Sequence, residues 1–141
     1  MQLQGLLAAL RKNWPTLKAG DQDAIFWSEQ WYKHGIYSEM EQAAYFQKTL
    51  DLFAKVGENL EDKLEAESVP PNGQPKTYKL KDVEAALEKV IGVNCRVICI
   101  PSKMNRNVEL IQEVRISYAT NFEPQDTLES SRCKSDVLFP I

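Results

Sequence analysis

The hydrophobic pattern of this chain changes once, after Gly92, and this change limits the fold classes open to it. Before Gly92 the apolar residues recur at helical spacing, whereas after it they alternate with polar residues as in β-strands. The predicted helices cover residues 3–10, 21–34, 38–56, 59–67 and 81–91, and the predicted strands cover residues 96–100, 108–118 and 137–139. Helices followed by strands predict an α+β fold, with several helices packed on an antiparallel sheet.

A single domain over residues 1–141 is the predicted organisation. The chain has 141 residues, a length typical of one domain. Residues 69–75, which are rich in proline and contain Asn-Gly, predict a loop. This loop could be a linker, but the residues after it supply too few apolar side chains for a separate core.

Residues 26–35, with the sequence FWSEQWYKHG, hold four aromatic side chains, a lysine and the only histidine of the chain. Helical spacing places four side chains on one face, with Lys33 at its edge: Trp27, Gln30, Trp31 and His34. Such a face could hold a phosphate and a stacked base. The alternative is an amphipathic helix whose tryptophans face the core and whose histidine is favoured at the last turn by the helix dipole.

This segment resembles the second active-site segment of the ribonuclease T2 family, F-W-x-H-E-W-x-K-H-G-T-C, as found in plant S-type and S-like enzymes. The matching positions are Phe26, Trp27, Trp31, Lys33, His34 and Gly35. Three positions depart from the pattern, because Glu29 replaces His, Gln30 replaces Glu and Tyr37 replaces Cys. Further similar segments follow the family order: residues 13–17 (NWPTL), 44–52 (AYFQKTLDL), 78–83 (YKLKDV) and 109–114 (ELIQEV).

The resemblance implies an endoribonuclease fold and a reaction, the cleavage of RNA by transphosphorylation to a 2′,3′-cyclic phosphate. It assigns His34 the base-type role and Lys33 the stabilisation of charge on phosphorus. Gln30 takes the position of the catalytic glutamate, and Glu29 that of a histidine that contacts phosphate. Trp27 and Trp31 are the expected substrate contacts, and RNA or a nucleotide is the only partner that the resemblance implies. Neither a cofactor nor a metal ion is implied.

The same residues predict a catalytically impaired relative, a pseudoenzyme. A mechanism that uses two histidines cannot be assembled from the one present, and the Gln30 amide cannot transfer a proton. We also expect truncation at the N-terminus, since the family's first active-site segment, H-G-L-W-P, and its first strands would precede Met1. An edge strand would then be unpaired.

Two alternatives stay open, and so does the question of whether the chain is an enzyme. One is an active ribonuclease whose N-terminal part is missing from this sequence. The other is a non-catalytic nucleotide-binding or storage protein that keeps the fold.

Three cysteines leave one thiol unpaired if one disulfide forms. By resemblance, Cys99 and Cys133 occupy positions that the family joins, and Cys95 is the free thiol. Ser117 and Tyr37 stand where cysteines of two other family bridges belong. The alternative is that all three cysteines are reduced and buried as small apolar side chains. No C-x-x-C is present, so a metal site is not predicted.

Charge and hydropathy bear on partners and location. The net charge of −3 argues against strong, sequence-independent binding of nucleic acid. No apolar run reaches the length of a membrane span, so no membrane association is expected. Residues 1–11 lack the basic start of a secretory signal, although the family that the chain resembles is secreted or vacuolar.

Overall fold

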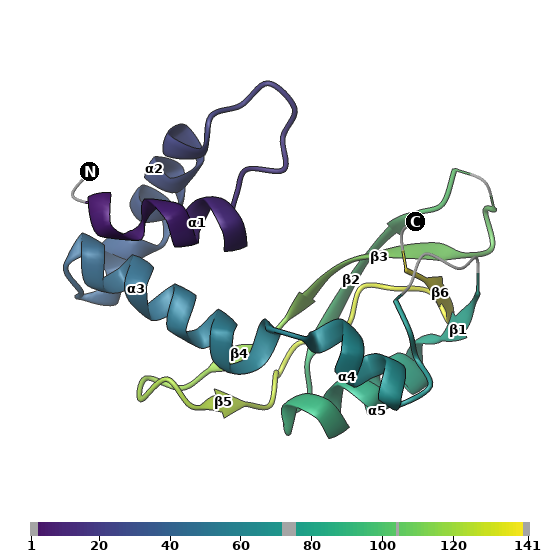
Figure 1. Ribbon diagram of the computed structural model, residues 1–141. Helices are drawn as coiled ribbons and strands as arrows, with labels where there is room; N and C mark the ends of the chain where they lie inside the picture. The colour runs from purple at the N-terminus through teal and green to yellow at the C-terminus, as the bar shows by residue number, and fades with distance from the viewer. Residues whose placement is uncertain (1–2, 72–75, 104, 140–141) are drawn as a thin grey trace. The chain divides into compact units, whose positions relative to one another are not determined.

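The computed structural model describes residues 3–71, 76–103 and 105–139. The chain divides into two compact units, Met1–Glu58 and Asn59–Ile141, each with its own apolar core (Figure 1). In the described residues the first unit is helical, whereas the second combines helices with strands. No helix among the described residues has both the length and the apolar character needed to cross a membrane.

The first unit is built from short helices around an aromatic core. Its elements are η1 (Gln4–Leu6), α1 (Leu7–Asn13), α2 (Asp23–Lys33), η2 (Gly35–Ser38), α3 (Gln42–Leu52) and the π-helical η3 (Phe53–Gly57). The buried core residues are Leu3, Leu10, Trp27, Phe46 and Leu50. The Trp14 ring contacts the rings of Phe26 and Phe46, so the turn after α1 is tied to both following helices.

The predicted start of the third long helix is wrong. The sequence Ser38-Glu39-Met40-Glu41 has the spacing of a capping box, which would begin this helix after residue 38, but α3 begins at Gln42 and its N-cap makes no side-chain hydrogen bond. The Ser38 hydroxyl instead donates to the Gly35 carbonyl at 2.6 Å and closes the turn of η2. Glu39 takes a left-handed backbone conformation, with φ of 58°, which separates η2 from α3.

The second unit packs helices against a sheet. Its elements are α4 (Leu60–Ala66), β1 (Tyr78–Lys79), α5 (Leu80–Ile91), β2 (Arg96–Pro101), β3 (Glu109–Arg115), β4 (Ser117–Tyr118), β5 (Pro124–Gln125) and β6 (Asp136–Leu138). The core is formed by Leu64, Val69, Tyr78, Val83, Ala86, Leu87, Val97, Ile111 and Val137. The α+β class is confirmed, since α5 buries its apolar face in the core shared with these strands.

The sheet is mixed, not antiparallel as predicted. Its order is β1-β6-β3-β2, with β6 antiparallel to β1 but parallel to β3. The last strand is therefore central in the sheet, which the chain order did not indicate. The predicted strand 108–118 also divides after Arg115, and its final residues form a separate two-stranded sheet, β4-β5.

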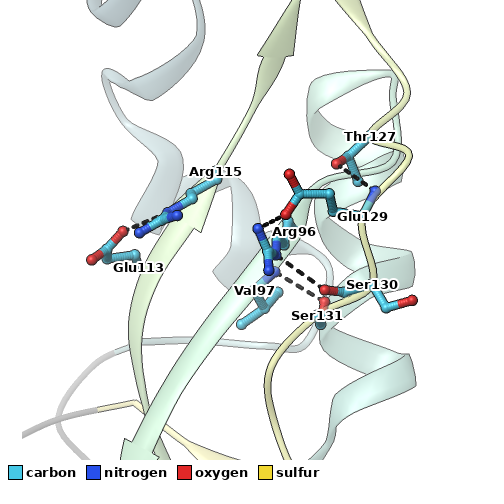
Figure 2. Close-up of polar contacts among 8 residues, drawn as sticks. All are labelled: Arg96, Val97, Glu113, Arg115, Thr127, Glu129, Ser130 and Ser131. Carbon is cyan, nitrogen blue, oxygen red and sulfur yellow. Dashed lines mark hydrogen bonds and ion pairs between the residues drawn. The ribbon is translucent and has the colours of Figure 1, made fainter. Parts of the chain in front are cut away.

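The outer edge of β2 pairs in part with a later segment of the chain. This segment, residues 126–133 (the strap), runs beside β2, and its Arg132 forms a parallel bridge with Ile98. The backbone amide of Arg132 donates to the Val97 carbonyl at 2.8 Å, and the Cys99 amide donates to the Arg132 carbonyl at 3.0 Å. Figure 2 shows the start of this pairing, where the Val97 amide donates to the Ser131 hydroxyl at 2.9 Å.

Candidate functional site

The candidate site lies on α2 and the turn that follows it, and Trp27 anchors this helix. The Trp27 side chain is 1% exposed, and its indole Nε1 donates to the Trp14 carbonyl at 2.8 Å. The amide of Thr16 donates to the Asp23 carboxylate at 2.8 Å, which holds the first turn of the helix. Trp27 is thus a packing residue, as the amphipathic interpretation expected, and it has no exposed ring face to offer a base.

Trp31, one turn further on, is only partly buried. Its ring meets that of Tyr45 in an edge-to-face arrangement, with centroids 5.7 Å apart. The indole also lies directly against the Cα of Gly35, so that a Cβ at this position would overlap with the ring. Close packing against Trp31 therefore requires a glycine at position 35, directly after the last turn of α2.

Lys33 and Glu29 form an ion pair across one turn of α2. The Lys33 Nζ lies 2.9 Å from the Glu29 Oε2, and the two side chains are 61% and 53% exposed. A pair this exposed adds at most about 1 kcal/mol to stability. The ammonium that the resemblance assigns to phosphate therefore already has a carboxylate partner.

His34 is the C-cap residue of α2 and is exposed to solvent. Its backbone amide donates to the Gln30 carbonyl at 3.0 Å, and its carbonyl accepts from the Tyr37 amide at 3.2 Å. Within residues 3–71, no hydrogen bond or ion pair holds its imidazole. The structure thus brings Gln30, Lys33 and His34 together at the last helical turn, without a second titratable group that orients the histidine.

One surface of α2 was not predicted from the sequence. An open depression there is lined by Ala24, Ile25, Ser28, Glu29, Tyr32 and Lys33. Ile25 is 49% exposed and Tyr32 is 68% exposed, so both add apolar surface to this depression. Their i, i+7 spacing on one helix face could have identified this surface from the sequence.

The disulfide is confirmed between Cys99 and Cys133, whose sequence separation is 34. Cys95 is the free cysteine and is buried. Burial raises the pKa of the Cys95 thiol to about 11, assisted by the negative charges of Asp126 and Glu88. Because Cys99 and Cys133 are joined, the alternative in which all three cysteines are reduced is wrong for this structure.

In the part of the chain that the structure describes, no group of three or more His, Cys, Asp or Glu could hold a metal ion.

Comparison with known proteins agrees with this fold. The sequence profile of the Ribonuclease T2 family matches residues 1–133. Intracellular ribonuclease LX from Solanum lycopersicum is 31% identical over 143 residues, which cover 99% of this chain and 59% of that protein. Ribonuclease T2 from Sus scrofa is 28% identical over 135 residues, which cover 91% of this chain and 66% of that protein. The chain thus spans less than two thirds of the length of these curated relatives.

Solved structures give the same result. RNase NT, in a complex with 5′-AMP, superposes with a TM-score of 0.81 at 29% identity and covers 98% of this chain and 68% of its own. Ribonuclease MC1 from the seeds of bitter gourd superposes with a TM-score of 0.84 at 23% identity, over 97% of this chain and 70% of its own, which supports the fold alone.

Proposed function

Because this chain belongs to the ribonuclease T2 family, we propose that it keeps a nucleotide-binding fold but has lost most or all RNA-cleaving activity. The observation that carries this proposal is the ion pair between Lys33 and Glu29. The family reaction needs a free cation beside the phosphorus to stabilise the negative charge of the transition state. Here the Glu29 carboxylate is paired with the Lys33 ammonium, and its negative charge repels the phosphate that this ammonium would bind.

The proton transfers are the second support for impairment. Transphosphorylation needs one group that removes the proton of the 2′-hydroxyl and another that protonates the leaving 5′-oxygen. These 141 residues contain a single histidine, His34, and the Gln30 amide neither takes up nor releases a proton near neutral pH. Loss of a general acid or base costs about 10²–10⁴-fold each, so these 141 residues by themselves should give little turnover.

Nucleotide binding is the part of the function that we propose is retained. Trp31 is partly exposed at the last turn of α2, and Lys33 and His34 follow it. A base could stack on the accessible part of the Trp31 indole while its phosphate meets the Lys33 ammonium and the His34 imidazole. The relative RNase NT has been solved with 5′-AMP, which makes this nucleotide the probe of choice. The disulfide further suggests an oxidising location, secreted or vacuolar.

The test measures cleavage and binding separately. Incubation of the purified chain with RNA at mildly acidic pH should produce no 2′,3′-cyclic phosphate ends above background. Turnover that disappears in a His34→Ala variant would contradict the impairment. In calorimetric titrations with 5′-AMP, Glu29→Gln should bind more tightly than the wild type, because it releases Lys33. Glu58→Gln removes the same charge from the same unit and serves as the matched control, and an equal gain in both variants would argue against a specific role of Glu29.

A further inference from the structure

Three arginines lie on one face of the sheet in the second unit. Arg96 on β2 and Arg115 on β3 are direct cross-strand partners, so their side chains leave the sheet on the same side. Ile98 is two residues from Arg96 on β2, so the two side chains share one face of the sheet. Arg132 on the strap pairs with Ile98, so its side chain lies on this face as well. The fully buried Val97 takes the opposite face, toward α5 and the core.

The charges on this face are only partly balanced. Arg96 forms an ion pair with Glu129, and its Nε donates to the Ser130 carbonyl at 3.1 Å. Arg115 Nε lies 2.8 Å from the Glu113 Oε2. Arg132 is exposed, and within the described residues its guanidinium has no hydrogen bond or ion pair. Three cations therefore face two carboxylates, and Figure 2 shows Glu113 beside Arg115 and Glu129 beside Arg96.

The environment of Arg96 reflects this excess of positive charge. Its side chain is 11% exposed, and burial lowers the pKa of the guanidinium. The neighbouring charges of Arg132 and Arg115 lower that pKa further. Repulsion of this kind is relieved when an anion binds among the cations.

We propose that Arg132, Arg115 and Arg96 form a binding site for a phosphate group of a nucleic-acid strand. Adjacent segments of a sheet are about 4.8 Å apart, so guanidinium groups on three neighbouring segments reach one phosphate. Arg132 makes the first contact, and Arg115 joins by exchanging the Glu113 carboxylate for a phosphate oxygen. The planar donor fork of arginine fits phosphate oxygens in pairs.

None of these three arginines belongs to α2, the helix that carries the proposed function. A purely structural role explains Arg96, because its contacts with Glu129 and Ser130 fasten the strap to β2. The same role does not explain Arg115, which is 56% exposed, or the exposed Arg132. An accessory phosphate site accounts for all three positions.

The experiment uses the whole chain and a short fluorescein-labelled oligodeoxyadenylate, which lacks the 2′-hydroxyl and cannot be cleaved. Fluorescence anisotropy gives the dissociation constant over a range of salt concentrations. Arg132→Gln should bind roughly two- to fivefold more weakly at low salt. The negative slope of log affinity against log salt concentration should become shallower by about 0.7, as expected when one contact with a single strand is lost. Arg106→Gln is the matched control, because it removes the same charge from the loop between β2 and β3.

Two further variants separate binding from structure. Arg132→Lys should keep most of the affinity, since it preserves the charge and the backbone pairing of the strap. Glu113→Gln should tighten binding roughly two- to fivefold, because it releases Arg115, and loss of structure cannot produce such a gain. Inorganic phosphate should displace the oligonucleotide from the wild type more effectively than chloride at equal ionic strength.

Equal affinities of Arg132→Gln and Arg106→Gln would overturn the proposal, as would equal displacement by phosphate and chloride. A Lys33→Gln variant distinguishes this site from the one on α2. If Lys33→Gln weakens binding but Arg132→Gln does not, the inference fails while the proposed function stands. The reverse result supports the arginine site and contradicts nucleotide binding at α2.

Discussion

Removal of the Cys99–Cys133 disulfide should strongly destabilise the second unit. The bond joins β2 to the strap across a sequence separation of 34, so it closes a large loop in the unfolded chain. The loss of loop entropy for a separation of 34 corresponds to about 3.8 kcal/mol of stability at room temperature. With a urea m-value of about 1–3 kcal/mol per molar, the unfolding midpoint should fall by roughly 1–4 M.

The assay compares three samples by urea unfolding: the oxidised wild type, the reduced wild type and a Cys99→Ala/Cys133→Ala variant. The reduced wild type keeps both sulfur atoms and therefore isolates the effect of the cross-link. The double variant also loses the packing of two partly buried side chains against the core. Reductant should shift the wild type and leave the double variant unchanged.

The tryptophans make the same experiment a test of the predicted single domain. All three tryptophans, Trp14, Trp27 and Trp31, lie in the first unit, whereas the disulfide lies in the second. Tryptophan fluorescence thus follows the first unit, and circular dichroism follows both. In one cooperative domain both signals shift together on reduction, whereas two independent units leave the fluorescence transition in place.

One outcome would refute the entropy argument. If reduction costs less than about 1 kcal/mol, the loop-closure model fails for this chain. The backbone pairing of the strap with Val97 and Cys99 would then hold the segment without the bond.

Three further predictions concern single residues. Gly35→Ala should cost about 1–3 kcal/mol in urea unfolding, because its Cβ overlaps with the Trp31 ring; Gly5→Ala, with no atom near its added Cβ, is the neutral control. The hydrogen bond from Lys79 lowers the pKa of Asp136 in the folded protein. The ionised Asp136 therefore stabilises the fold above the pKa of about 3.9 that it has in the unfolded chain, and this stabilisation is lost as the pH falls through the lower pKa of the folded protein. Asp136→Asn should therefore be less stable than the wild type at pH 6, the difference shrinking in acid; a constant difference in pH-dependent unfolding would contradict the assignment. With a pKa of about 11, the Cys95 thiol should resist iodoacetamide at pH 8 in the native protein and react after unfolding, as mass spectrometry can measure.

The helices could be predicted from the sequence because their ends are set locally. Pro15 follows the turn that closes α1, Gly57 ends η3, and Gly92 takes the left-handed conformation after α5. The capping box at Ser38 failed because Ser38 belongs to the turn of η2 and the left-handed Glu39 follows it, which places the N-cap of α3 at Glu41. A sequence pattern identifies a possible N-cap but not a neighbouring turn that moves the start of the helix.

The sheet and the candidate site were less accessible from the sequence. The three residues of β6 carry no signal for their parallel pairing with β3, because that pairing depends on contacts distant in sequence. On α2, Trp27 and Trp31 share a helix face, and the sequence pattern cannot tell which of them is fully buried. The ion pair between Glu29 and Lys33 has the i, i+4 spacing that favours such contacts and could have been predicted.

The central position of β6 has a consequence for synthesis on the ribosome. Residues 136–138 pair with β1 on one side and with β3 on the other, although they are translated after both. Until they leave the ribosomal tunnel, β1 has no neighbour in the sheet and one edge of β3 stays open. The nascent second unit is therefore exposed to aggregation for almost the whole of its translation, while the helical first unit can already collapse around Trp27.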